Sequence, residues 1–249
     1  MFRPALVTTS APPVMQRGAA LLIMLAILTL SISAFLLSGT SRIQHLLNTP
    51  YKNMSALSQA KNALIAYSRL SDPDLSAATG LQLRYLPCPD IDGDGIEDTP
   101  CGATSTEGWL PWMSLGVSPL RDASGTCLRY FISSAYKQGA SVTPSITPAL
   151  PSGDFNLRNT STVIATDVVA VIIGPGHALD GQARDLSAGT ATVCGSSVSS
   201  SAKNLAVNYM DSILGVDNSV APNFITAPVQ VNATANFNDT LLVILAEDL

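Results

Sequence analysis

The sequence predicts an α+β fold, in which one long N-terminal helix precedes a head of strands and loops. Three observations lead to this prediction. Residues 19–37 form an apolar run without a charged side chain. Residues 162–173 are rich in β-branched residues and are followed by a Gly-Pro-Gly turn, a pattern typical of a buried strand or strand pair. Residues 241–245 resemble a further, C-terminal strand.

The composition narrows the class of protein. The formal net charge is -5, which argues against a nucleic-acid partner, because such proteins present a basic face. Charged residues make up 12% of the chain, against roughly 25% in ordinary soluble domains. Small residues replace them, which suits an extracytoplasmic domain rich in loops and strands.

The apolar run predicts a transmembrane segment at residues 19–38. A helix rises about 1.5 Å per residue, so the run approaches the roughly 30 Å thickness of a bilayer core. Three interpretations compete: a secretory signal peptide cleaved near Ala34, an ordinary signal anchor, or a prepilin-type signal. In the third, a basic leader ends in glycine directly before the helix, as Arg17 and Gly18 do here.

The helix is expected to continue beyond the apolar run. Leu57, Ala60, Leu64 and Tyr67 recur at helical spacing and form one apolar stripe. Pro50 should kink or break the helix, and the sequence Ser-Asp-Pro at 71–73 should end it. We therefore expect a long helix over 19–71 and a globular head over 72–249.

The stretch Gln-Arg-Gly-Ala-Ala-Leu-Leu at 16–22 resembles the processing site of type IV pilins, minor pilins and type II secretion pseudopilins. The resemblance implies a leader over 1–18, cleavage after Gly18 by a prepilin peptidase, and methylation of Ala19. It also implies a transmembrane helix packed on a small antiparallel β-sheet head. Met15 is an alternative start that gives a shorter leader.

The same resemblance implies a location and partners. The chain would be a single-pass protein of a bacterial inner membrane, with its head in the periplasm, and would assemble with other pilin or pseudopilin subunits. Most such subunits carry a glutamate at the fifth mature position, where this chain has Ile23. Its absence is typical of tip or initiating subunits and points to a minor subunit.

Four cysteines indicate two disulfides in an exported chain: Cys88, Cys101, Cys127 and Cys194. Three connectivities are possible. We favour Cys88–Cys101, which closes a short loop, and Cys127–Cys194, which joins distant segments; unpaired buried thiols are the alternative. Because there is no Cys-x-x-Cys pair and only two histidines are present, a zinc site is not expected.

An acidic loop follows Cys88 and predicts a calcium site. Its four candidate ligands are Asp90, Asp92, Asp94 and Asp98. Alternating carboxylates with Gly95 match the start of an EF-hand loop, and oxygen ligands suit a hard cation. The twelfth position is Cys101 rather than glutamate, so Asp98, the Ile96 carbonyl and water would complete the shell. A solvated acidic turn is the alternative.

Further motifs extend the resemblance over about residues 15–137. The stretch Leu-Pro-Cys-Pro-Asp at 86–90, together with Gly-Trp-Leu-Pro-Trp at 108–112 and Leu-Arg-Tyr at 128–130, resembles pilin-like proteins with prepilin-type N-termini. In those proteins the tryptophan segment packs on the long helix.

Catalytic motifs are absent: there is no Gly-x-Ser-x-Gly elbow, and two histidines leave little room for a catalytic triad. We therefore expect no enzyme but a structural minor pilin or pseudopilin of a type IV pilus or a type II secretion machine. The alternative is a calcium-binding periplasmic enzyme or adhesin held by an ordinary signal anchor.

Overall fold

The computed structural model describes most of the helix and the head, at residues 17–70, 85–101, 106–137, 152–184, 194–195, 204–231 and 236–249. Within the helix, side chains are described at 21–33 and 50–70. The chain divides into two compact units, Met1–Asn48 and Thr49–Leu249. Residues 1–16, which include most of the expected leader, lie outside the described residues.

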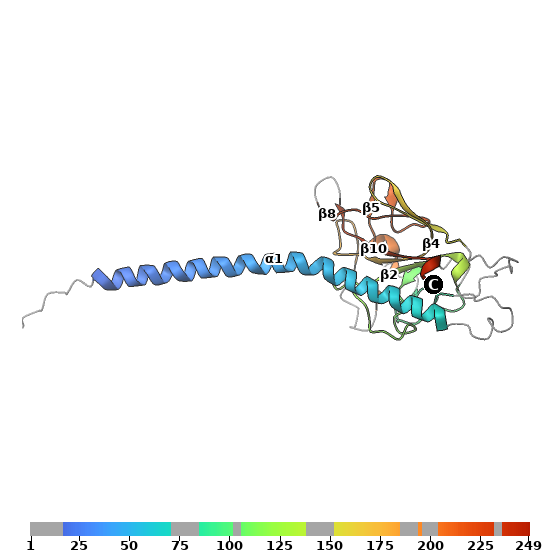
Figure 1. Cartoon of the computed structure of the whole chain (residues 1–249), viewed down its shortest axis with the longest axis horizontal. Coiled ribbons are helices and arrows are strands. Elements are labelled where there is room, and N and C mark those ends of the chain that lie inside the picture. Colours follow the sequence, from blue (N-terminus) through green and yellow to red (C-terminus); the bar gives the residue numbers. More distant parts are fainter. Residues whose placement is uncertain are drawn as a thin grey trace, which may run out of the picture. The chain divides into compact units, whose positions relative to one another are not determined.

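The N-terminal element is one long helix, α1, which spans Arg17–Leu70 (Figure 1). The expected helix over 19–71 lies within two residues of these bounds. Pro50 lies inside α1, and the helix continues through it. Of the two expected outcomes, a kink or a break, the break is therefore wrong. The Gly18–Ala19 junction falls in the first turn.

The transmembrane prediction is corrected by the structure. In the part of the chain that is described, no helix is long and apolar enough to cross a membrane. The described apolar side chains at 21–33 cover about 20 Å of helix, whereas a bilayer core is roughly 30 Å thick. This finding contradicts the predicted segment 19–38, the fold class built on it, and the predicted single-pass location in an inner membrane.

The head is organised around the long strand β4, Val163–Gly174. Antiparallel to it run β2 (Arg129–Ile132), β10 (Thr240–Leu245) and β3 (Phe155–Arg158). The predicted strands at 162–173 and 241–245 correspond to β4 and β10.

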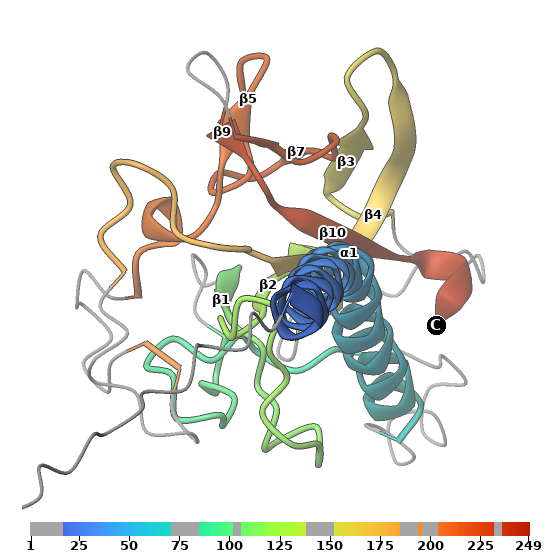
Figure 2. The same cartoon turned by 90° about the vertical axis from the view of Figure 1, so that its left-hand side faces the viewer.

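The main sheet has six strands and is mixed. It is completed by β1 (Glu107–Trp109), antiparallel to β2, and β7 (Asn223–Ile225), parallel to β3. The small antiparallel sheet that the resemblance implied is therefore corrected at one pairing, because β7 runs parallel to β3. In Figure 2, β3 and β7 lie side by side next to the first half of β4.

Small elements complete the described part of the head. Two short hairpins and three 3-10 helices are present there: β5 (Ser212–Ile213) with β6 (Val216–Asp217), β8 (Gln230–Val231) with β9 (Asn236–Phe237), and Ser134–Tyr136, Ala206–Asn208 and Ala246–Asp248.

The second half of β4 is apolar at every position because it is covered on both faces. Ala170 and Ile172 pack in a core that includes Leu57 and Leu64 of α1. Val168, Val171 and Ile173 pack in a second core with the aromatic rings of β2, β3 and β7. Two-sided burial explains why an uninterrupted apolar run, rather than an alternating one, forms this strand.

Polar contacts also hold the second half of α1 to the sheet. The Lys61 ammonium lies 2.8 Å from an Asp248 carboxylate oxygen and donates to the Val243 carbonyl at 3.1 Å. The Asn53 amide oxygen accepts the Ala123 N–H at 2.6 Å. These contacts fix the rotation of the helix, so that its apolar stripe faces the core.

Candidate metal centre

The acidic loop precedes β1 and is tied at both ends. The Asp90 and Trp109 backbones exchange two hydrogen bonds of 3.0 and 2.6 Å, which attach the loop to the sheet. The Cys88–Cys101 disulfide closes the loop across 13 residues. Both favoured disulfides are present in the structure, and Cys127–Cys194 is the second.

Three of the four predicted ligands converge. One carboxylate oxygen from each of Asp90, Asp92 and Asp98 lies within 4.8 Å of the others, so this group could hold a metal ion. Asp94 is not part of the group. Its Oδ1 instead accepts the N–H of Ile96 at 2.7 Å, which shapes the turn. The structure therefore assigns Asp94 a turn-forming contact rather than a place in the cluster.

Asp90 is the buried member of the group, with no exposed surface. Its two oxygens accept the N–H groups of Gly93 at 2.6 Å and of Gly95 at 2.7 Å. Burial raises the pKa of Asp90 to about 7, with repulsion from Asp94 and Asp92 adding to it and the two N–H donors opposing it. A cation beside this carboxylate would offset both burial and repulsion.

Asp92 and Asp98 are half-buried and complete the cluster. Burial raises the pKa of Asp92, and the nearby Asp94 and Asp98 carboxylates add to the effect. The Asp98 Oδ2 accepts the Ile91 N–H at 2.6 Å, so the end of the loop folds back onto its beginning. Oxygen donors at this spacing are the chemistry that a hard divalent cation requires.

Two glycines allow the loop to turn this sharply. Gly93 and Gly95 have φ angles of 77° and 92°, which L side chains rarely adopt. A Cβ on Gly93 would overlap the Cys194 carbonyl, and one on Gly95 would overlap the Trp112 indole. The loop is therefore packed against the rest of the head instead of standing free in solvent.

Contacts that the sequence pattern does not reveal lie around the cluster. The Cys194 N–H donates to the Gly93 carbonyl at 2.8 Å, so the second disulfide also anchors the loop. The two oxygens of Glu97 accept the Tyr67 hydroxyl at 2.9 Å and the Cys88 N–H at 3.0 Å. Glu97 thus joins the loop to α1. No spacing rule could have identified these pairs, because the partners lie in separate segments.

The tryptophan segment is divided between the two cores, so that only part of it packs on the long helix as the resemblance implied. Leu110 belongs to the core that contains the α1 residues, but Trp109 belongs to the second core. The Trp109 ring meets Tyr209 edge-on at 4.7 Å, and the Arg129 guanidinium lies 4.2 Å from its centre. Burial lowers the pKa of Arg129 to about 9. Trp109 therefore supports the face of the sheet opposite the helix.

Comparison of the chain with protein families, with characterised proteins and with solved structures finds no match.

Proposed function

We propose that this chain is a non-enzymatic assembly subunit of the pilin class, which packs through the apolar N-terminal part of α1 into a fibre of similar subunits. The observation that carries the proposal is the exposure of the side chains at 21–33. Every one of these side chains is exposed, and most are large and apolar.

The arrangement of these side chains indicates the kind of partner. Successive helix residues are rotated by about 100°, so five consecutive residues surround the axis. Leu21, Leu22, Ile23, Met24 and Leu25 are apolar and more than half exposed. An apolar surface that surrounds a helix requires burial from several sides. A bundle of like helices in the centre of a fibre provides this burial.

The processing signal supports the same proposal. Gln-Arg-Gly-Ala at 16–19 resembles the site at which a prepilin peptidase cuts and methylates its substrates. Cutting there leaves the apolar helix on the mature chain. Ile23 in place of the usual glutamate favours a minor subunit.

Mass spectrometry of the mature N-terminus tests the proposal. The chain is expressed with and without a prepilin peptidase. We expect an N-terminus at methylated Ala19 only when the peptidase is present, and no processing of a Gly18→Val variant. An intact leader both with and without the peptidase, or cleavage near Ala34, would contradict the proposal.

We further propose that the acidic loop binds calcium through Asp90, Asp92 and Asp98, and that the ion stabilises the head without taking part in chemistry. Calorimetric titration of the full chain with calcium tests this. The Asp92→Ala and Asp98→Ala variants should each bind calcium at least about tenfold more weakly than the parent chain. Asp94→Asn is the matched control, because its amide oxygen can still accept the Ile96 N–H. Equal losses in all three variants, or no binding by the parent chain, would refute the site.

A further inference from the structure

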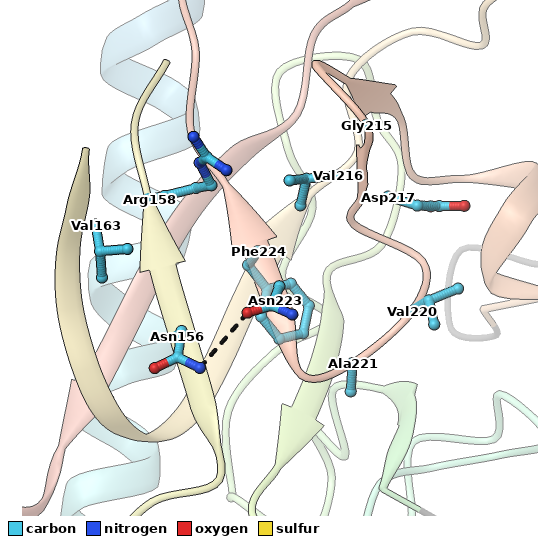
Figure 3. A pocket seen from close by; sticks show the side chains of 10 residues that line it. All are labelled: Asn156, Arg158, Val163, Gly215, Val216, Asp217, Val220, Ala221, Asn223 and Phe224. Carbon is cyan, nitrogen blue, oxygen red and sulfur yellow. Dashed lines mark hydrogen bonds between the residues drawn. The ribbon is translucent and has the colours of Figure 1, made fainter. Parts of the chain in front are cut away.

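A cavity of about 500 Å³ lies on the outer face of β3 and β7, apart from the acidic loop (Figure 3). Strand alternation creates its polar floor. Phe155 and Leu157 point into the core, while Asn156 and Arg158 of the same strand line the cavity. The loop from Gly215 to Ala221 forms the opposite wall. The volume falls in the range of small-molecule sites.

Arg158 supplies the charge in this cavity. Arg158 is half-buried, and its hydrogen bond within the described residues is a long one of 3.4 Å from Nε to the Asn159 carbonyl. It forms no salt bridge with any described carboxylate. Asp217 also lines the cavity, but its Oδ1 accepts the N–H and O–H of Ser219 at 2.8 and 2.6 Å. In Figure 3, the Asp217 carboxylate points away from Arg158.

Two amides line the same cavity as Arg158. Asn156 and Asn223 are paired across the parallel strands, and their side chains meet at 3.5 Å, which is a weak hydrogen bond. Each amide has both donor and acceptor capacity left for a ligand. Val163, Val216 and Val220 add apolar surface around this polar floor.

We propose that this cavity binds a small ligand that carries a carboxylate beside neutral hydrogen-bonding groups. The carboxylate pairs with Arg158, whose planar fork of N–H donors matches two oxygens. The hydroxyl or amide groups of the ligand bond to Asn156 and Asn223. Sugar acids and free peptide C-termini share this chemistry. This proposal does not rest on fibre assembly or on calcium binding by the acidic loop.

Nuclear magnetic resonance titration of the full chain tests this proposal with two acids, glucuronate and N-acetylalanylalanine. Glucose and the peptide amide are their neutral counterparts. We expect at least one acid to shift the side-chain amide signals of Asn156 and Asn223, and to bind at least about tenfold more tightly than its counterpart. The acid that binds identifies the source of the carboxylate.

Two variants test the site by different means. Arg158→Gln removes the charge and should weaken binding by about tenfold or more. Val163→Phe narrows the cavity without changing the charge, and should weaken binding as well. Arg69→Gln, at an exposed arginine in α1, is the control. Equal binding of acid and neutral counterpart, no loss in Arg158→Gln, or no binding of either acid below about 10 mM would overturn the proposal.

Discussion

The two ends of α1 belong to one helix but have opposite side-chain environments. At 21–33 every side chain is exposed, although most are apolar. At 50–70 the apolar residues Ala56, Leu57, Ala60 and Leu64 are buried, while polar residues such as Lys52, Gln59 and Asn62 are exposed. The comparison shows that helix formation alone does not determine what a helix packs against. The distribution of apolar residues around its axis does.

The difference has a physical basis. A stripe about 100° wide can be buried by a single sheet, as the stripe at 50–70 is. An apolar surface that surrounds the axis cannot be buried by one sheet and requires several neighbours. Under the proposed function, the first end is buried by association with other subunits, whereas the second end is buried by the fold of the head.

The largest expected effect tests the first end. Ile27 and Val207 are both 58% exposed, the first in α1 and the second in the head. We expect Ile27→Asp to abolish self-association of the full chain, because a charge would have to be buried between helices. Val207→Asp should leave association unchanged. Sedimentation velocity measures the self-association of both variants. If Ile27→Asp and Val207→Asp associated equally, the exposed part of α1 would not differ from the surface of the head in this respect.

The next effect tests the second end. Leu64 is fully buried, so Leu64→Ala should lower the free energy of unfolding by about 2–5 kcal/mol. Leu28→Ala at the exposed end should change it by less than about 0.5 kcal/mol. Urea unfolding, followed by the fluorescence of the buried Trp109, measures both values. A similar loss in both variants would show that the two ends contribute alike to the fold.

A smaller effect concerns the dependence of folding stability on pH. The helix residues at 21–33 include no titratable group, whereas the head contains buried carboxylates. The pKa of Asp90 is about 7 in the folded chain, against an ordinary value of 3.8. Its contribution to stability is therefore fully present below about pH 3.8 and is lost as the pH rises through about 7. Burial likewise raises the pKa of Asp239 well above its ordinary value.

Thermal unfolding measures this pH dependence. In a metal chelator, we expect the melting temperature to fall by a few degrees between pH 5 and pH 8. Calcium should reduce the fall, because it favours the ionised form of Asp90. In Asp90→Asn, the calcium-dependent part of the fall in melting temperature should disappear, and the part due to Asp239 should remain. If the fall in melting temperature were the same with and without calcium, Asp90 would not be a calcium ligand.

The smallest effect concerns the link between α1 and the acidic loop. Tyr67→Phe removes the hydroxyl that donates to Glu97, and should cost about 1 kcal/mol of unfolding free energy. It should also weaken calcium binding slightly, since Glu97 helps to hold the loop. Tyr51→Phe, at an exposed tyrosine of the same helix, is the matched control. An unchanged stability in Tyr67→Phe would mean that the loop does not depend on the helix.

Local patterns predicted much of the fold. Helical spacing located the buried residues Leu57, Ala60 and Leu64, and β-branched content located β4. The parallel pairing of β3 with β7 was not predicted, because both strands are short and far apart in sequence. The transmembrane prediction failed because hydropathy measures how apolar a run is, and within the described residues that run is too short.

The candidate site was also predicted in part. Alternating aspartates located the loop and three converging carboxylates. The orientation of the Asp94 side chain could not be predicted, since it depends on a local hydrogen bond that its carboxylate accepts from the Ile96 N–H. The roles of Tyr67, Glu97 and Cys194 depend on tertiary contacts, which have no signature in the spacing of residues.

The contact between Gly93 and Cys194 also bears on the order in which the molecule is completed. A ribosome makes the acidic loop about a hundred residues before Cys194, and the Cys127–Cys194 disulfide spans 67 residues. The nascent loop therefore lacks one wall of its final environment until that later segment has been made. The loop can therefore reach its final environment only after the segment that contains Cys194 has been synthesised.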